Sequence, residues 1–172
     1  MDNIVARIDA AEKFVFIEFF IVADGELFER LLKALSRKVE QGVEVRIMYD
    51  DAGSLGLLSR NAKKRVRQAG ILLQPFSRML SPFSFALNFR DHRKIIVIDG
   101  KTAYAGGCNV VDECIQSRAV FKDAGVRIDG GAVDAMTLAF LRQWEFVCGK
   151  CADWGDYVGL SEPADNASVV MP

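Results

Sequence analysis

The sequence has 172 residues, of which 51% are hydrophobic and 26% are charged, and this composition excludes a disordered chain. Its 22 basic and 23 acidic residues give a net charge of −1, which excludes a general electrostatic attraction to nucleic acid or to an anionic membrane. The length suits one domain with one core. We therefore expect a single domain over residues 1–172, with its core at about 8–147 and a tail at 148–172.

No segment predicts a membrane span or a secretory signal. The longest apolar stretch, residues 14–23, is interrupted by Glu18 and has about half of the roughly 20 residues that a membrane-spanning helix needs. The charged N-terminus lacks the basic start and the apolar run of a signal peptide. We expect this chain by itself to be soluble.

The cysteines are expected to be free thiols, because a domain of this size with a real core does not need disulfides. They are Cys108, Cys114, Cys148 and Cys151. The spacing of the last pair would also suit a redox motif or half of a zinc site. Partly buried thiols near a helix end are the preferred interpretation, because the single His of the chain lies far upstream.

The first part of the chain predicts a strand, a helix and a second strand. Residues 14–22 are continuously aromatic and β-branched, which is typical of a strand covered on both faces. Leucine and phenylalanine recur at helical spacing over 27–35, and Gly42 suits the end of that helix. Residues 43–47 alternate between apolar and polar before a polar turn at 50–54, and this pattern predicts the second strand.

The alternation continues with a helix over 57–69 and a short strand over 71–73 that stops at Pro75. Residues 77–87 show no clear period and are expected to form a loop. A helix is predicted over 131–147, after the last strand. Repeated strand–helix–strand units predict an α/β fold, a single α-β-α sandwich whose mixed, largely parallel sheet has helices on both faces.

The strongest turn signal is Asp99-Gly100, which lies between two strand-like runs. This dipeptide predicts a β-hairpin closed by a type I′ turn. Counting back from a two-residue loop gives three expected pairs: Ile98 with Lys101, Lys94 with Ala105, and His92 with Gly107.

This hairpin assembles the residue types of a phosphate site. His92 and Lys94 project from the same face because side chains alternate along a strand, whereas Asp99 sits at the turn. The small residues 105–107 opposite them let a ligand approach the backbone, and Asn109 adds a neutral donor. An imidazole, an ammonium group and amides around one space suit phosphate, because the His can attack phosphorus while Lys and Asn stabilise charge on the oxygens.

Each of these residues also has an ordinary explanation. The His could be a structural residue with its hydrogen bonds made inside the protein, the Lys could end a strand in solvent, and the Asp could only form a turn. Their combination favours the phosphate site. Glu18 could approach the same sheet edge, but a buried, ion-paired Glu is equally consistent, so we do not place it in the site.

A basic cluster on the second predicted helix could touch anionic headgroups or nucleic acid. A solvated helix face is preferred, because the net charge of the domain is near zero. The cluster comprises Arg60, Lys63, Lys64, Arg65 and Arg67.

His92-Arg93-Lys94, followed by Asp99, Gly106-Gly107 and Asn109, resembles the HxKxxxxD motif of the phospholipase D superfamily. Within it, residues 88–95, 109–113 and 123–144 are most similar to the first catalytic half of bacterial cardiolipin synthases. The similarity covers about residues 8 to 147. Cys114 and Phe121 depart from the family pattern, where an aromatic residue and Trp are usual.

The resemblance implies a role for each motif residue. His92 would be the nucleophile that forms a phosphohistidine, or the acid partner of another His. Lys94 and Asn109, with Gly106 and Gly107, would bind the phosphate. Asp99 belongs to the catalytic motif and would brace its strand and turn. No metal or other cofactor is implied.

Asp123 occupies the place where similar members of the superfamily have a carboxylate that orients the catalytic His. Such a carboxylate would favour the imidazolium form of the His. The structural alternative is a charge at the end of a strand.

The resemblance further implies two such motifs facing each other, one His attacking and one protonating the leaving alcohol. This chain has one His, so we expect a second half beyond Pro172 or a second copy as its partner. The apolar, strand-like ending at 167–172 also favours a chain that continues.

The leading hypothesis is a phosphatidyltransferase that joins two phosphatidylglycerols into cardiolipin and releases glycerol. The alternatives are a homodimeric phosphodiesterase or nuclease of the same superfamily, and a regulatory half with a vestigial motif. For the first hypothesis the full-length protein is expected at the bacterial cell membrane, with its catalytic domain on the cytoplasmic side. Its partner would be an anionic phospholipid, and nucleic acid is not expected as a partner.

Overall fold

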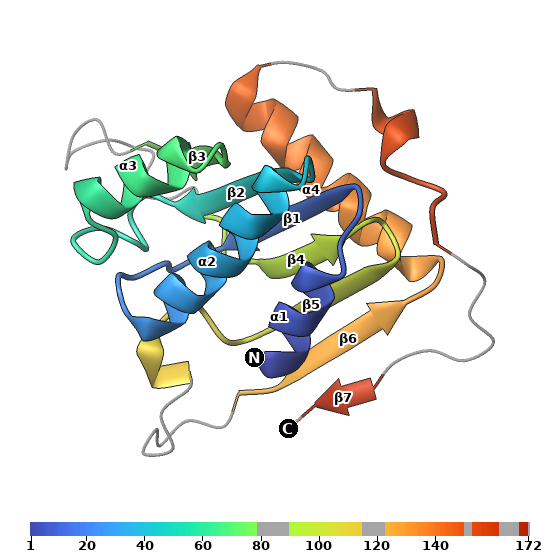
Figure 1. Ribbon diagram of the computed structural model, residues 1–172, viewed down its shortest axis with the longest axis horizontal. Coiled ribbons are helices and arrows are strands. Elements are labelled where there is room, and N and C mark those ends of the chain that lie inside the picture. Colours follow the sequence, from blue (N-terminus) through green and yellow to red (C-terminus); the bar gives the residue numbers. More distant parts are fainter. Residues whose placement is uncertain (79–89, 115–122, 150–152, 162–168, 172) are drawn as a thin grey trace.

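The computed structural model describes residues 1–78, 90–114, 123–149, 153–161 and 169–171 (Figure 1). The strands form one sheet in the order β3-β2-β1-β4-β5-β6-β7. They are β1 (Phe14–Phe19), β2 (Glu44–Asp50), β3 (Leu72–Phe76), β4 (Lys94–Ile98), β5 (Thr102–Gly106), β6 (Gly125–Asp129) and β7 (Val169–Met171). The helices are α1 (Asp2–Asp9), α2 (Glu26–Glu40), α3 (Arg60–Gln68) and α4 (Ala132–Cys148), with 3-10 turns η2 (Asp112–Cys114) and η3 (Trp154–Asp156).

The predicted α/β class and mixed sheet are confirmed, but the parallel part is smaller than expected. Strands β1, β2 and β3 pair in parallel, whereas β4 pairs antiparallel with β1, and β5, β6 and β7 continue antiparallel. The tight turn between β4 and β5 is the reason for part of this difference, because strands joined by a short hairpin must run in opposite directions.

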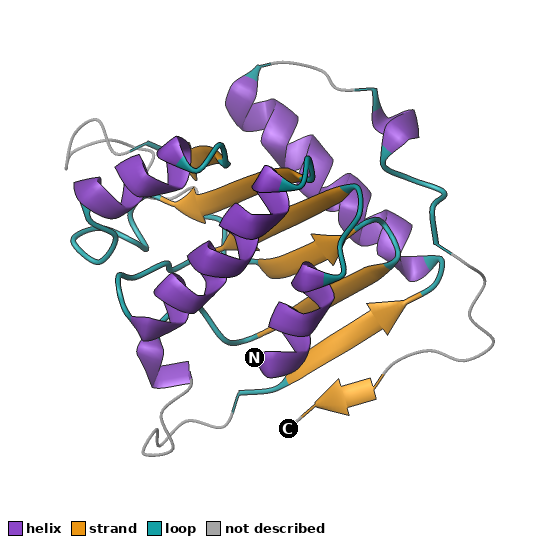
Figure 2. Cartoon of the chain, viewed as in Figure 1, coloured by secondary structure: helices purple, strands orange, loops and turns teal. Residues whose placement is uncertain are grey.

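Helices cover both faces of the sheet, as predicted (Figure 2). Val15 and Ile17 of β1 belong to the core cluster that includes α2, and Phe14 and Phe16 belong to the cluster that includes Phe140 of α4. Successive side chains of a strand point to opposite faces, so a strand between two helical layers is apolar on both faces, and Glu18 is the exception in β1. All six residues of β1 are buried, which confirms the interpretation of the apolar run.

The predicted helices are present with shifted ends. Helix α3 begins at Arg60 and not at Leu57, because the Ser59 side chain accepts a hydrogen bond from the Ala62 backbone N–H and caps the helix there. Strand β3 continues through Pro75, where the sequence predicts a stop. Pro75 is tolerated because β3 is paired on one side only among the described strands, so its missing N–H costs no ladder bond. The predicted loop over 77–87 lies almost wholly outside the described residues.

The predicted type I′ turn is confirmed, but the predicted register is wrong by one residue. Asp99 and Gly100 both have positive φ, 54° and 64°, and the Lys101 N–H donates to the Ile98 carbonyl. Ile98 nevertheless pairs with Thr102, because Lys101 stays in the turn as an extra residue. Lys94 therefore comes level with Gly106 and not with Ala105.

No helix in the described part of the chain is long and apolar enough to cross a membrane.

Candidate functional site

A pocket of about 450 Å³ brings several of the predicted site residues together. It lies among α1, the start of α2 and strands β4 to β6, and Lys94, Gly106, Asn109 and Asp123 line it. These residues are as much as 29 positions apart in the sequence, so the sheet and not the local sequence assembles them.

Lys94 begins β4 opposite Phe19 of β1 and is buried. Its Nζ donates a 2.8 Å hydrogen bond to the carbonyl oxygen of His92 and lies 5.4 Å from the centre of the Phe20 ring. Burial lowers the pKa of Lys94, while the charges of Asp123 and Asp91 act in the opposite direction. An anion in the pocket would therefore meet a poorly hydrated ammonium group held in place by the backbone of the motif.

The His92 side chain is exposed, just before β4 begins. Its ring packs against the ring of Phe20, with 4.8 Å between the centroids. Phe20 thus contacts both His92 and Lys94, a role that the sequence does not reveal because Phe20 sits in a long apolar run. Gly53 also touches Phe20, since a Cβ at Gly53 would come within 2.5 Å of the Phe20 carbonyl oxygen.

Asp123 lies over Gly107. A side chain at Gly107 would collide with the Asp123 carboxylate, and one at Gly106 would come within 2.8 Å of the Ala124 carbonyl oxygen. Both glycines are therefore needed so that the segment before β6 can approach β5, whether or not a ligand is bound. Asp123 itself is exposed, and it shares the pocket with Lys94.

Asn109 is oriented by the end of β1. Its Oδ1 accepts a 3.0 Å hydrogen bond from the backbone N–H of Ile21. The next residue strengthens this contact, since the Val110 N–H donates to the Ile21 carbonyl. The amide nitrogen of Asn109 is consequently the end that can donate to a ligand.

Asp99 lies at the opposite end of β4 from His92 and does not reach the pocket. Its buried carboxylate accepts hydrogen bonds of 2.8, 2.8 and 2.9 Å from the backbone N–H groups of Glu12, Lys13 and Phe14. These contacts fit the predicted brace of the motif strand. They do not bring Asp99 together with the other motif residues.

A buried carboxyl pair lies beside the motif. Glu18 is 1% exposed and 2.7 Å from a guanidinium nitrogen of Arg93, whose Nε also lies 3.1 Å from the Asp91 carboxylate. Burial, together with the adjacent Asp91, raises the pKa of Glu18 to about 9 despite Arg93. Burial acts to raise the pKa of Asp91 as well, but hydrogen bonds from Glu18 and Arg93 outweigh it and lower that pKa. The buried position of Glu18 beside Arg93 is confirmed. Its ionisation is not confirmed, because a carboxyl group with a pKa of about 9 is protonated at pH 7.

No sequence motif marks Asp50 or Asp91 as functional, yet Asp50 connects Asp91 of this pair to the loop that follows β2. The completely buried Asp50 carboxylate accepts hydrogen bonds from the backbone N–H groups of Gly53 and Asp91. The one feature of the sequence that could have indicated a role for Asp50 is its place as a carboxylate at the end of an apolar strand. The segment that carries His92 is therefore tied to the loop that follows β2.

Replacing Glu18 with glutamine is expected to flatten the dependence of stability on pH. In the unfolded chain Glu18 loses its proton near its ordinary pKa of 4.5, whereas in the folded protein it keeps the proton until about pH 9. The folded state then binds more protons, so the free energy of unfolding of the wild type falls as pH rises through this window, by up to about 1 kcal/mol per pH unit. Urea denaturation between about pH 5 and about pH 8 measures this slope.

Exposed Glu113 provides the control, because Glu113→Gln removes a similar charge without burial. Equal slopes for Glu18→Gln and the wild type would show that Glu18 is ionised in the folded protein.

The expectation of free thiols is wrong for Cys108 and Cys114, which form a disulfide. Their Cα atoms are 6.1 Å apart because the chain turns back through η2, and this separation lies in the range of disulfides. The spacing of six residues gave no hint of the turn. Cys148 takes no part in this disulfide, and Cys151 lies outside the described residues.

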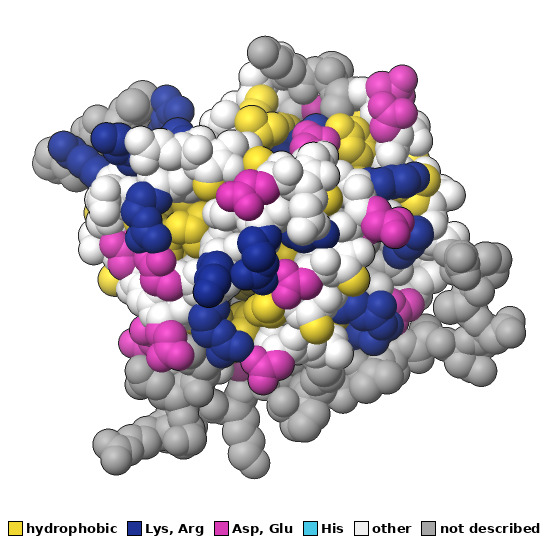
Figure 3. Space-filling view, in the orientation of Figure 1, with side chains coloured by type: hydrophobic (Ala, Val, Ile, Leu, Met, Phe, Trp, Pro, Cys, Tyr) yellow, Lys and Arg dark blue, Asp and Glu magenta, His cyan; other side chains and the backbone are white. Residues whose placement is uncertain are grey.

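The basic cluster of α3 fits a solvated helix face. Arg65 forms two 2.6 Å hydrogen bonds with the Glu29 carboxylate, and Lys63 lies 3.5 Å from Asp51. Figure 3 shows Lys and Arg side chains interspersed with Asp and Glu on the face that carries α2 and α3. Part of the cluster is thus already neutralised by the protein itself.

Comparison with known proteins agrees with the motif. Residues 4–128 match the family model described as cardiolipin synthase, PLD-like domain. The cardiolipin synthase of Geobacillus kaustophilus is 39% identical over 165 residues, which cover 94% of this chain and 32% of that protein. A cardiolipin synthase of Staphylococcus aureus is 37% identical over 146 residues, 83% of this chain and 30% of that protein. The chain therefore spans about a third of the length of these relatives.

Solved structures share the fold. Nuc from Salmonella typhimurium, a phospholipase D family member, superposes with a TM-score of 0.62 over 95% of this chain and 90% of its own, at 18% identity. NucT from Helicobacter pylori gives a TM-score of 0.60 over 84% of this chain and 86% of its own, at 14% identity. The motif, the fold and the family match lead to one assignment: this chain belongs to the phospholipase D-like domain family of the cardiolipin synthases.

Proposed function

We propose that this chain supplies one half of the active site of a phosphatidyltransferase, which joins two phosphatidylglycerols into cardiolipin and releases glycerol. The observation that carries the proposal is the pocket that combines Lys94, Asn109 and Asp123. Exposed His92 does not line this pocket, but its carbonyl oxygen accepts the 2.8 Å hydrogen bond from Lys94 Nζ. The relatives of the chain support the substrate class, since proteins 37–39% identical to it are named cardiolipin synthases.

In the proposed reaction a His92 nitrogen attacks the phosphorus of one phosphatidylglycerol, and the bond to the glycerol oxygen breaks. The departing oxygen takes a proton from an acid. A hydroxyl group of a second phosphatidylglycerol then attacks the phosphohistidine, loses its proton to the same acid–base group, and frees the imidazole as cardiolipin forms.

The pocket residues stabilise the charge that develops in both steps. Lys94 and the Asn109 amide nitrogen donate to the non-bridging phosphate oxygens, and Gly106 adds its backbone to the lining of the pocket. Asp123 would orient the His92 ring and stabilise its cationic form. Asp99 acts at a distance by fixing the strand that carries the motif.

The acid must come from a second motif, because one imidazole cannot be bonded to phosphorus and protonate the leaving group in the same step. This chain has one His. The proposed partner is a second half of the same polypeptide or a second copy of the chain. The full-length enzyme would work at the bacterial membrane, with this domain on the cytoplasmic side.

A trapped intermediate tests the proposal. The complete protein, with both motifs intact, is mixed with phosphatidylglycerol that carries a radioactive phosphate and is quenched with denaturant within the first turnover. An acid-labile, alkali-stable phosphoramidate is expected on His92, since the adduct forms in the first step and is consumed only in the second. Mapping of the labelled peptide identifies the residue. An adduct confined to the second motif would reverse the two roles, and a complete protein that makes no cardiolipin would reject the function.

A homodimeric phosphodiesterase is the second candidate, and the near-complete mutual coverage with the Nuc chain favours it. Under this alternative the chain alone hydrolyses a generic phosphodiester, and its activity rises with the fraction of dimer measured by light scattering. Under either candidate a monomer should be nearly inactive. Robust turnover by a species shown to be monomeric would contradict both.

A further inference from the structure

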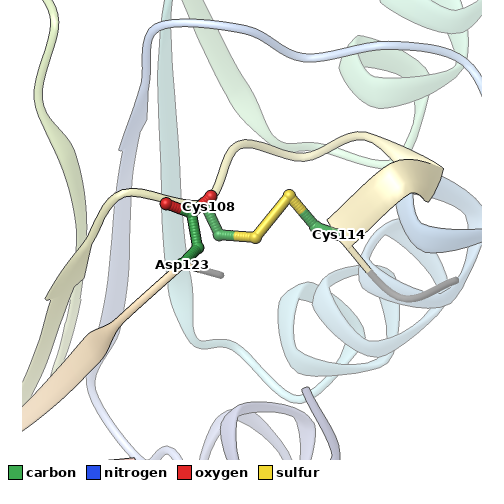
Figure 4. A group of neighbouring side chains, drawn as sticks. All are labelled: Cys108, Cys114 and Asp123. Atoms are coloured by element: carbon green, nitrogen blue, oxygen red, sulfur yellow. A yellow bond between two sulfur atoms is a disulfide. The ribbon is translucent and has the colours of Figure 1, made fainter. Parts of the chain in front are cut away.

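Three potential metal ligands meet beside the phosphate pocket. The sulfur atoms of Cys108 and Cys114 and a carboxylate oxygen of Asp123 lie within 4.8 Å of one another, and all three residues line the pocket. Figure 4 shows the Asp123 side chain next to Cys108, with the disulfide running on to Cys114. Neither the motif nor the proposed reaction uses the two sulfur atoms.

The backbone holds the two cysteines close together independently of the disulfide. Between them, Val110 exchanges hydrogen bonds with the segment that follows β1, where its carbonyl accepts from the Ala23 N–H and its own N–H donates to the Ile21 carbonyl. Asp112 accepts hydrogen bonds of 3.0 and 2.8 Å from the backbone N–H groups of Glu26 and Leu27 at the start of α2. Both halves of the connecting loop are thus anchored, so reduction would leave the two thiols as neighbours.

The third ligand is anchored as well. The Gly107 N–H donates to the Ala124 carbonyl at 3.2 Å, next to Asp123, and Gly106 pairs with Gly125 at the start of β6. Two separate segments therefore present their ligand atoms to one point without a rearrangement of the chain.

The chemistry of this ligand set selects a soft divalent cation. Two thiolates and one carboxylate suit Zn²⁺, which takes sulfur at about 2.3 Å and oxygen at about 2.0–2.2 Å in a tetrahedral arrangement. Ca²⁺ and Mg²⁺ require sets made of oxygen and do not fit. With three protein ligands, the fourth position of the ion would remain available to water or to an anion in the pocket.

We propose that Cys108, Cys114 and Asp123 form a Zn²⁺ site that exists only when the cysteine pair is reduced. A dithiol reductant supplies two electrons and two protons to the disulfide and becomes a cyclic disulfide itself. Each Cys thiol then loses its proton to solvent as the thiolate binds the ion. A disulfide oxidant, such as oxidised glutathione, takes two electrons from the two thiolates and, with two protons, becomes two thiols. The Cys108–Cys114 bond forms again, which removes both sulfur ligands and releases the metal.

This site shares the pocket and Asp123 with the proposed catalysis, which itself needs no metal. Its consequence for the reaction rests on the proposed function: bound Zn²⁺ would engage the carboxylate assigned to orient His92 and would place a second cation near Lys94. Metal binding would then inhibit transfer. The binding itself is measured without turnover, so its failure and the failure of the proposed function are distinguishable.

The test is a Zn²⁺ titration of the purified chain against a chromophoric chelator, with and without prior reduction under anaerobic conditions. The reduced chain is expected to take up one Zn²⁺ and the oxidised chain none. With Cd²⁺ as the probe, the reduced chain should show the ultraviolet thiolate-to-metal charge-transfer band. Cys108→Ser and Cys114→Ser should each abolish tight binding, and Asp123→Asn should weaken it at least about 10-fold.

The matched control is the double variant Cys148→Ser, Cys151→Ser, which removes the other two thiols and should bind as the wild type does. Circular dichroism checks that each variant is folded. Equal Zn²⁺ uptake by the reduced and oxidised chains would overturn the proposal. Uptake that survives Cys108→Ser but disappears in the double variant would also overturn it, because the metal would then sit at the other cysteine pair.

Discussion

Replacing His92 with alanine is expected to lower phosphatidyl transfer by the complete protein about 10³-fold or more, because no other group in the chain can form the phosphohistidine. The substitution should cost little stability, since the side chain is exposed and packs against Phe20 only at its surface. The product is measured as cardiolipin formed from phosphatidylglycerol vesicles, and folding is checked by the urea midpoint.

Lys101→Ala is the matched control for this experiment. Lys101 is exposed and lies in the turn of the same hairpin, far from the pocket, so this variant should keep both activity and stability. A His92→Ala protein that retains a large fraction of wild-type transfer would remove His92 from the reaction. Loss of activity in Lys101→Ala would instead point to a general disturbance of the hairpin.

Replacing Asp99 with alanine is expected to lower the free energy of unfolding by about 3–5 kcal/mol, because three backbone N–H groups would lose a charged acceptor and at least one would stay buried without a partner. The positive φ of Asp99, 54°, adds to the loss, since alanine tolerates this conformation less well than Asp or Asn. Urea denaturation of the chain measures the change.

Asp99→Asn separates the two contributions. Asparagine tolerates the same backbone conformation and keeps an acceptor oxygen, so its effect should be intermediate. Any loss of transfer in either variant should follow the fraction of unfolded protein. A strong loss of activity in Asp99→Asn at full stability would mean that Asp99 takes part in the chemistry directly. Unchanged stability of Asp99→Ala would show that its three hydrogen bonds do not stabilise the motif strand.

Local pattern was sufficient for much of the fold and for the core of the candidate site. The apolar run at 14–22 identified the central strand, and leucine spacing identified α2, because burial on one or two faces leaves a period in the sequence. Asp99-Gly100 identified the hairpin because those two residues favour the positive φ angles of its turn. The motif around His92 and Lys94 identified the family because its residues are close together in the chain and can be read as one pattern.

Features that depend on distant parts of the chain were decided only by the tertiary structure. The three partners of Asp99 and the packing of Phe20 on His92 are contacts of β1 and its flanking residues with the motif, more than 70 positions away in the sequence. The pairing of Glu18 with Arg93 belongs to the same group. Such contacts leave no period and no spacing, because they arise when strands far apart in sequence become neighbours in the sheet. The one-residue shift of the hairpin is local, but the strand pairing and not the turn signal decides it.

The cysteines also show the difference between what the sequence predicts and what the tertiary structure decides. Composition alone indicated that the domain needs no disulfide for its stability, and this argument concerns the whole chain. Whether two thiols meet depends on the path of the chain between them. Here Val110 is bonded to the segment after β1 and Asp112 to the start of α2, and these contacts bend the chain so that Cys114 returns to Cys108. The sequence determined which residue types were present, and the fold determined which of them share a pocket, because side-chain neighbours across a sheet are set by strand order and register.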